Sequence, residues 1–477
     1  MASAKRGQKT PYRGGPDAPA GPAPSGDEGL VGDLVRQFAD PLAFYRELVQ
    51  NALDAGATRI VARLVWSDAG EDAEGDERGV LRVSVGDDGC GMDQRTLEED
   101  LTVLFRSSKE NDDATIGKFG IGFVSVLAVS PTLVAVDTCR GSIEGAPPES
   151  FTLHLHPDRT YDLYRGSLTE RGTTVTLHVP MREDDVASFV ERSEKALRRW
   201  CRHVRAPTHL VVVAPGEGEL REVRIDEPFA LDAIAVCSER RGEDLSVLVG
   251  LPRDAQALGA FYNRGLLLHE TRDHELGPIV FKVMGSRLEH TLSRDDVRRD
   301  THYDEAIALV RASLRSLPRE AARAALAACE AYVAGDAASG ALLVSIVRAL
   351  EAAGLPVHEH QLVLPLIEPV SERRTVRADA LGPSTLVARA SSPLVRAVAA
   401  AGHEVLDLRI AGSSQSDLAW LVGWITARTR GIREASARFA LVEDVAADEV
   451  DVALARRVAA LLAELAREPG DVLFVRI

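Results

Sequence analysis

The order of the elements expected between about residues 29 and 183 constrains the fold of this chain most. The patterns there predict helix, helix, strand, strand, helix, glycine loop, helix and then several strands. The segments VARLVW and VLRVSVGDD carry the β-branched residues of strands, and the acidic stretch between them predicts a solvated loop. This mixed order of helices and strands departs from the strict alternation of strand and helix that is typical of βαβ folds.

The length of 477 residues predicts about three domains, since a domain typically takes about 150 residues. The first 28 residues are rich in Pro, Gly and Ala and lack apolar bulk, so we expect a disordered tail there. The parts expected after it are a first α+β domain at 29–190, a larger α/β part at 200–318, a helical connector at 319–353, a smaller α/β part at 354–430 and a C-terminal α/β extension at 431–477.

Charge and cysteine content narrow the classes of function. The chain has 56 Lys and Arg against 72 Asp and Glu, a net charge of −16, and shows no long basic cluster, so nucleic acid is not expected as a partner. Its five cysteines are scattered without a C-x-x-C pair, which argues against a disulfide scaffold or a zinc site. No apolar segment predicts export or membrane insertion, and we therefore expect a cytoplasmic protein without membrane contact.

The segment DPLAFYRELVQNALDAGATRI at 40–60 predicts a well-delimited helix. Asp40 can cap the helix, Pro41 suits its first position and Gly56 suits its exit. The helix carries an apolar stripe and, on another face, three polar residues that lie four and then three positions apart. These polar residues are Glu47, Asn51 and Asp54.

Two glycine-rich segments follow this helix. In GDDGCGMD at 86–93, closely spaced glycines allow a tight turn while Asp87 presents a carboxylate at the end of a strand. Such a carboxylate can accept a hydrogen bond from an exocyclic amine. In ATIGKFGIGFVSVLAVS, the glycines precede an apolar helix whose first amides attract phosphate. No G-x-x-x-x-G-K-[ST] occurs, which excludes the P-loop type of nucleotide site.

The segments ELVQNALDAG, DDGCGM, IGKFGIGF and RGTTVTLHV follow one another in this order. Together they resemble the four nucleotide-binding motifs shared by gyrase, the 90-kDa heat-shock chaperones, histidine kinases and MutL, the GHKL or Bergerat fold. This resemblance implies an α+β fold in which helices are layered on a mixed or antiparallel sheet. The resemblance implies an ATP site at 29–190 in which Glu47 activates the attacking water and Asn51 binds Mg²⁺. It also implies that Asp87 accepts a hydrogen bond from the adenine amine, with Thr173 supporting it through water. The other nucleotide contacts that it implies are Asp54, Ala55, Gly91, Met92, Lys109, Gly117, Gly120, Ile121, Gly122 and Phe123.

The second part of the chain favours one branch of this superfamily. The segments GAFYNRGLLLHE and FKVMGSRLEHTLSRDDVRRD, and further on residues 384–417, resemble the middle domain of the 90-kDa heat-shock chaperones, which are HtpG-like. Arg294 falls on that family's arginine for the γ-phosphate. Thr291 and Arg298 depart from the family pattern beside it. The resemblance covers about 30–420 and implies a short form without the usual C-terminal dimerisation domain.

The resemblance implies an ATPase that acts as a chaperone. Because histidine kinases lack a hydrolytic glutamate at the position of Glu47, its presence favours hydrolysis over phosphotransfer. The function expected is slow, Mg²⁺-dependent ATP hydrolysis that drives a clamp-like cycle on unfolded or partly folded client proteins, with a homodimer formed when nucleotide is bound. Two alternatives stay open: a MutL-like ATPase that organises or repairs DNA, and a nucleotide-binding sensor without turnover.

Overall fold

In a computed structural model, the chain divides into two compact units. The first consists of residues 1–230, 261–269 and 284–298, and the second of residues 231–260, 270–283 and 299–477. The structure describes residues 12–14, 40–68, 79–101, 121–141, 148–157, 160–213, 220–254, 256–291, 296–359, 361–435 and 457.

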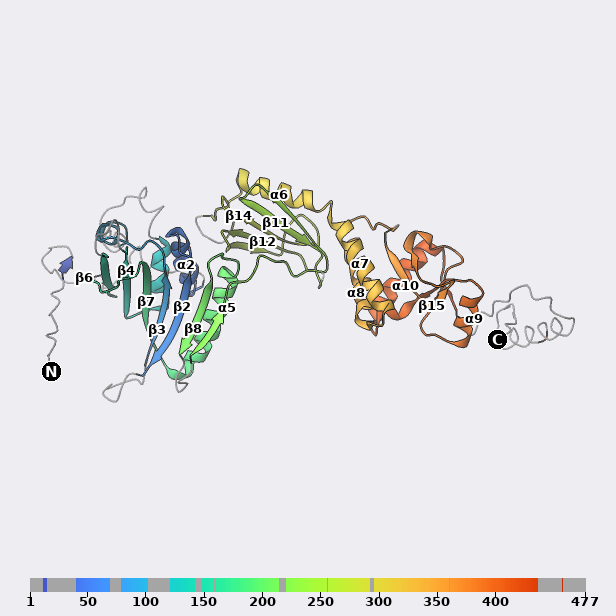
Figure 1. Ribbon diagram of the computed structural model, residues 1–477, viewed down its shortest axis with the longest axis horizontal. Helices are drawn as coiled ribbons and strands as arrows, with labels where there is room; N and C mark the ends of the chain where they lie inside the picture. The colour runs from blue at the N-terminus through green and yellow to red at the C-terminus, as the bar shows by residue number, and fades with distance from the viewer. Residues whose placement is uncertain are drawn as a thin grey trace, which may run out of the picture. The chain divides into compact units, whose positions relative to one another are not determined.

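A mixed nine-stranded sheet forms the framework of the first unit, in the order β1-β6-β5-β4-β7-β3-β2-β8-β9 (Figure 1). Strand β2 pairs with β3 in antiparallel fashion and with β8 in parallel. The α+β fold expected from the sequence is therefore confirmed. The strands are β1 (Tyr12–Gly14), β2 (Ile60–Ser67), β3 (Gly79–Asp87), β4 (Leu133–Cys139), β5 (Ser150–Leu155), β6 (Tyr161–Arg165), β7 (Gly172–Met181), β8 (Thr208–Val213) and β9 (Arg221–Arg224).

Helices cover one face of this sheet. Along β3, Leu81 and Val83 are buried whereas Arg82 between them is exposed, the alternation of a sheet with one covered face. Helix α2 (Phe44–Asp54) contacts β3, and α5 (Glu183–Cys201) contacts both α2 and β8 (Figure 1). The buried apolar side chains of the two helices therefore form a core with the covered face.

Helix α2 begins later than the sequence predicts. The side chain of Asp40 accepts a hydrogen bond from the amide of Leu42 at 2.9 Å, which closes a turn before the helix instead of capping it. The helix starts at Phe44, so Pro41 lies in this turn. An Asp side chain commonly bonds the amide two residues on, and this local bond competes with helix capping. The predicted exit is confirmed, since Gly56 has a φ of +72°.

A second sheet has the strand order β10-β11-β14-β12-β13. Its strands are β10 (Val236–Arg241), β11 (Leu245–Gly250), β12 (Leu258–Asn263), β13 (Leu266–Thr271) and β14 (Val280–Gly285). Helix α6 (Thr301–Ser313) contacts β10 and β11. The carboxylate of Asp300 caps this helix by accepting bonds from the amides of His302 and Tyr303 at 3.0 and 3.1 Å.

Farther along the chain, the second unit contains helices followed by a small mixed sheet. Its helices are α7 (Leu317–Val333), α8 (Ala337–Ala352), α9 (Pro393–Ala400) and α10 (Gln415–Thr429). Its sheet has the order β16-β15-β18-β17-β19, with β15 at Val363–Val370, β16 at Arg373–Arg377, β17 at Leu386–Ala388, β18 at Val405–Asp407 and β19 at Arg433–Glu434.

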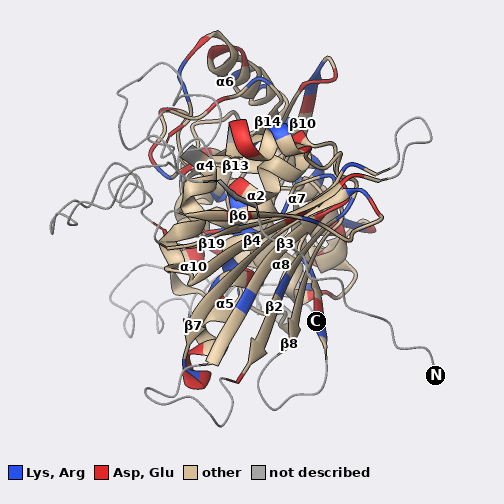
Figure 2. Ribbon diagram, turned by 90° about the vertical axis from the view of Figure 1, so that its left-hand side faces the viewer, with Lys and Arg blue, Asp and Glu red and all other residues tan. Residues whose placement is uncertain are grey.

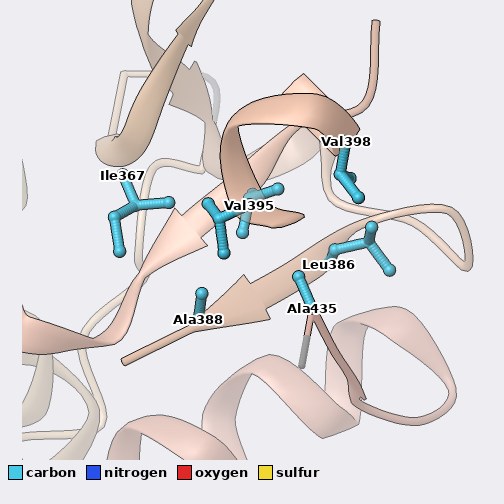
Figure 3. Close-up of a cluster of buried hydrophobic side chains, with 7 residues drawn as sticks. Ile367, Leu386, Ala388, Val395, Val398 and Ala435 are labelled. Carbon is cyan, nitrogen blue, oxygen red and sulfur yellow. The ribbon is translucent and has the colours of Figure 1, made fainter. Parts of the chain in front are cut away.

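The segments STLVARA, SPLVRAVAAAG and HEVLDLRI at 384–410 predict a strand, a helix and a strand, and this βαβ-like pattern is present in the sheet. Strands β17 and β18 are parallel, and α9 lies between them in the chain. In Figure 3, Val395 and Val398 of α9 lie over the strands. The apolar cluster that joins helix and sheet consists of Ile367, Leu386, Ala388, Val395, Val398, Val405 and Ala435.

Basic and acidic residues are interspersed over the described helices and loops (Figure 2). Pairs such as Arg221 with Glu194, at 2.6 Å, follow from this mixture. Among the described residues, no helix is both long and apolar enough to span a bilayer. Within the expected C-terminal extension, the sequence also predicts a helix at 451–467 and a final strand in DVLFVRI; except for residue 457, both lie outside the described part of the chain. The sequence-based domain boundaries remain predictions.

Candidate functional site

The end of helix α2 and the turn after strand β3 are in direct contact. The amide of Cys90 donates a hydrogen bond to the carbonyl of Ala55 at 2.9 Å. At Gly89, a Cβ atom would lie only 2.7 Å from the Cβ of Ala55, so this position accepts only glycine without movement. The helix that carries Glu47 and Asn51 is thereby fixed against the turn that begins at Asp87.

Asp87 lies opposite Thr173 where β3 pairs with β7. Its carboxylate oxygen accepts a hydrogen bond from the amide of Gly89 at 2.7 Å. Burial raises the pKa of Asp87, although hydrogen bonds from the backbone of Gly89 and Thr173 oppose the shift. A carboxylate has about four acceptor positions, so these two contacts leave room for a further donor.

The carboxylate of the next residue in the turn, Asp88, holds the backbone at Thr58 and Arg59. Its carboxylate accepts bonds from the amide and hydroxyl of Thr58, at 2.6 and 2.5 Å, and from the amide of Arg59 at 2.9 Å. Burial acts to raise the pKa of Asp88, but these hydrogen bonds outweigh it and lower the pKa. Two adjacent acids therefore have opposite environments, and only Asp87 has a raised pKa.

Thr138 on β4 joins three segments around Asp87. Its hydroxyl accepts a hydrogen bond from the amide of Met92 at 2.8 Å and lies 2.9 Å from the hydroxyl of Thr173. It also lies 3.3 Å from the carbonyl of Gly172. Since Thr138 is fully buried, this hydroxyl holds the turn in register with β4 and β7.

Two glycines let backbone segments approach closely in this region. Gly91 has a φ of +67°, and a Cβ there would lie 2.1 Å from the carbonyl oxygen of Cys139. Gly172 has a φ of +140°, and a Cβ there would lie 2.1 Å from the carbonyl oxygen of Asp87. Only glycine fits either position, so backbone segments meet there without side chains between them and hold the turn at Asp87 in place.

Gly91→Ala is expected to lower the free energy of unfolding of this unit by about 2–4 kcal/mol, because its Cβ would meet backbone atoms that cannot move aside. Gly56→Ala is the matched control, since Gly56 has a similar φ of +72° but nothing within 4 Å of a Cβ. The control should lose only about 1 kcal/mol, from the left-handed conformation alone. Chemical denaturation measures both, and equal losses would contradict the steric account.

The three polar residues of α2 do not share one environment. Glu47 is only 4% exposed, whereas Asn51 and Asp54 are exposed. The neighbouring Arg46, also buried, donates from its Nε and Nη2 to Oε1 of Glu47, at 3.2 and 3.0 Å. The spacing predicted that the three side chains share one face of the helix. Packing instead buries Glu47, the first of the three, and pairs it with Arg46.

The predicted phosphate loop is described only in part. Helix α4 begins at Ile121 and contacts α2, and the carbonyl of Gly122 accepts a bond from the hydroxyl of Ser125 at 2.5 Å. Phe123 is buried. The predicted site residues Lys109, Gly117, Gly120 and Arg294 lie outside the described residues.

Sequence reasoning overlooked residues that shape this site. Gly172 could have been found, because it begins the strand in the segment RGTTVTLHV. Arg46 and Thr138 gave no local signal, since neither forms a motif with its neighbours in sequence. Their roles follow only from helix packing and strand register.

Comparison with known proteins agrees with this geometry. Residues 45–144 match the family model described as histidine kinase-, DNA gyrase B-, and HSP90-like ATPase. A protein named chaperone protein HtpG from Methylococcus capsulatus is 30% identical over 205 residues, which cover 37% of this chain and 30% of that protein. The proteins of the same name from Chlorobium phaeovibrioides and Burkholderia lata are 30% and 27% identical over 207 and 187 residues, covering 39% and 36% of this chain.

These matches define the class of the first unit. The chain carries an HSP90/HtpG-like ATPase domain of the GHKL type. The matched segments span only 29–31% of the length of these three relatives. The activity and partners of a whole protein therefore do not follow from the matches.

Proposed function

We propose that this chain binds ATP with Mg²⁺ between α2, the turn at 87–92 and the start of β7, and hydrolyses it slowly. The observation that carries the proposal is the contact of Cys90 with Ala55 at 2.9 Å. It joins the helix bearing Glu47 and Asn51 to the turn bearing Asp87. This contact thus holds together the segments of Glu47, an acid suited to activating water, and of Asp87, an acid suited to recognising the adenine base.

The residues present fit an adenine nucleotide. At Gly91 and Gly172 the backbone packs directly against the carbonyls of Cys139 and Asp87, which fixes the turn that carries the Asp87 carboxylate. Asp87 keeps acceptor positions for an exocyclic amine, and Thr173 and Thr138 hold the adjoining strand ends. Bound ATP would supply the phosphoryl group whose transfer to water is the reaction.

Glu47 and Asn51 have the side chains that hydrolysis requires. We assign Glu47 to orienting a water molecule and accepting its proton, a role that a buried carboxylate can fill. In this structure its Oε1 is held by Arg46. Magnesium is commonly bound by one or two protein groups together with substrate phosphates, so the exposed amide of Asn51 suits it. The other nucleotide contacts that the resemblance implies, which run from Asp54 to Phe123 in the sequence, are proposed to contact ATP in the same way.

We further propose that ATP turnover drives a chaperone-like cycle on unfolded proteins. The support is the printed name of the relatives, chaperone protein HtpG, together with the middle-domain resemblance of residues 281–300. Arg294 is proposed to reach the γ-phosphate. The residues that flank it are joined, since the amide of Thr291 donates to the carbonyl of Asp296 at 2.9 Å. A cytoplasmic location and a nucleotide-dependent homodimer belong to this proposal.

ATP turnover should be Mg²⁺-dependent and should change when an unfolded protein is added. The measurement is phosphate release by the full chain with and without a chemically unfolded protein, beside light scattering with and without nucleotide. Turnover that responds to duplex DNA, with strong salt dependence, and not to unfolded protein would favour a DNA-organising ATPase instead. Nucleotide binding without any turnover would favour a sensor.

A further inference from the structure

The turn between β12 and β13, residues 263–265, packs tightly against the segment that follows α5. Gly265 has a φ of +96°, and a Cβ there would lie 2.1 Å from the carbonyl oxygen of His203 and 2.5 Å from the Cα of Val204. Arg264 also has a left-handed φ, of 48°. All of these residues belong to the first compact unit, so the turn is part of the unit that contains Glu47 and Asp87.

Aromatic packing fixes this turn in place. The ring of His203 lies 5.0 Å from that of Tyr262 and 5.4 Å from that of Phe229, both in edge-on geometry. His203 and Tyr262 are buried, and Nδ1 of His203 lies 3.3 Å from the carbonyl of Glu227. The position of the turn is therefore set by packing and does not depend on Arg264.

Arg264 reaches from this turn to the last residue of α2. Its Nη1 donates to Oδ1 of Asp54 at 3.0 Å, and both side chains are 58% exposed. Asp54 immediately precedes Ala55, whose carbonyl holds the amide of Cys90. An exposed ion pair contributes little to stability, so it can break and form again during a reaction cycle.

The preceding residue of the turn holds a different segment. Nδ2 of Asn263 donates to the carbonyls of Ser286 and Leu288, at 3.3 and 2.6 Å. Beyond Leu288, the amide of Arg298 donates to the carbonyl of Glu289 at 2.7 Å. Arg264 thus contacts the end of α2, and its neighbour in the turn, Asn263, contacts the segment that begins at Ser286.

We propose that Arg264 is a positioning residue for nucleotide turnover, acting through Asp54 to keep the end of α2 aligned with the 263–265 turn and the segment held by Asn263. The inference rests on the proposed function, since it assumes that α2 contributes to an ATP site. Arg264 itself is assigned no contact with nucleotide. Its loss should slow the rate-determining step without weakening binding.

Arg264→Ala is expected to lower kcat for ATP by about 2–5-fold while the Kd for ADP stays within about twofold, the range set by an exposed ion pair. Arg264→Lys should recover at least half of the lost rate, because the cation is retained. Raising the salt concentration should slow the wild type toward the variant and leave the variant unchanged. Steady-state phosphate release and calorimetric titration with ADP give the two quantities.

The matched control is Arg253→Ala, which removes another exposed ion pair, Arg253 with Asp232 at 2.8 Å, and should leave kcat unchanged. If Arg264→Ala turns over ATP as fast as the wild type while both bind ADP, the inference is wrong and the proposed function stands. If kcat falls in Arg264→Ala and equally in Arg253→Ala, a specific role of Arg264 is likewise excluded. Absence of nucleotide binding by the wild type would overturn the proposed function, and the inference with it.

Discussion

Glu47→Gln should reduce ATP turnover by at least about 100-fold, while ADP affinity stays within about threefold of the wild type. A general base typically contributes about 10²–10⁴-fold to the rate, and an amide cannot accept the proton of water. Glutamine is preferred to alanine because it leaves an acceptor for the buried guanidinium of Arg46, which donates to Glu47 at 3.0 Å. Removal of one partner of a buried ion pair is strongly destabilising. Phosphate release under saturating ATP measures the effect.

Glu191→Gln is the control for Glu47→Gln, because Glu191 lies on exposed α5 surface and pairs with Lys195 at 2.5 Å. It carries the same chemical change in the same unit and should keep the wild-type rate. A Glu47→Gln chain that binds ATP and hydrolyses it at the wild-type rate would remove Glu47 from the mechanism.

Asp87→Asn should weaken ADP binding by about 10–150-fold, which corresponds to loss of one hydrogen bond to a charged acceptor. The amide group would also direct N–H donors toward the amides of Gly89 and Thr173, which donate themselves. Calorimetric titration with ADP gives the change in Kd. Unchanged affinity would show that this carboxylate does not recognise the base.

Asp88→Asn is the matched control for Asp87→Asn, since the neighbouring carboxylate is used by Thr58 and Arg59. It should lower stability while the affinity for ADP stays within about twofold. The pH dependence gives a second check. Because the pKa of Asp87 is raised, its carboxylate protonates at a higher pH than an ordinary aspartate, and ADP affinity should begin to fall there as the pH is lowered. The Asp87→Asn chain should lack this step.

The sequence predicted the elements of the fold better than their pairing. Local patterns were sufficient for strands such as β7 and for the βαβ-like segment around α9, because alternation and flanking turns are local properties. They could not predict that β2 pairs in parallel with β8, far along the chain. The sequence also predicted too early a start for α2. An Asp before a helix can either close a turn or cap the helix, and which of the two occurs depends on the surrounding structure.

For the candidate site, the sequence indicated which segments to examine but not how each side chain is held. The register of β3 and β7 brings Asp87 opposite Thr173, a non-local fact. Helix spacing gave no reason to pair Arg46 with Glu47, since adjacent helix residues do not normally face each other. Burial of both side chains explains their ion pair. Thr138 was missed because a single threonine in a strand carries no signal until its neighbours are known.

The proposed function requires that the region beside Asp87 binds an adenine nucleotide. The most direct test is calorimetric titration of the full wild-type chain, in Mg²⁺, with ATP and then with GTP. We expect one site per chain with a Kd for ATP between about 1 μM and 1 mM, a typical range for enzyme substrates. We expect GTP to bind at least about tenfold more weakly, because guanine presents a carbonyl oxygen where adenine has its amine, and this oxygen would face a carboxylate. No binding of ATP in this range, or equal binding of ATP and GTP, would contradict recognition of adenine by Asp87.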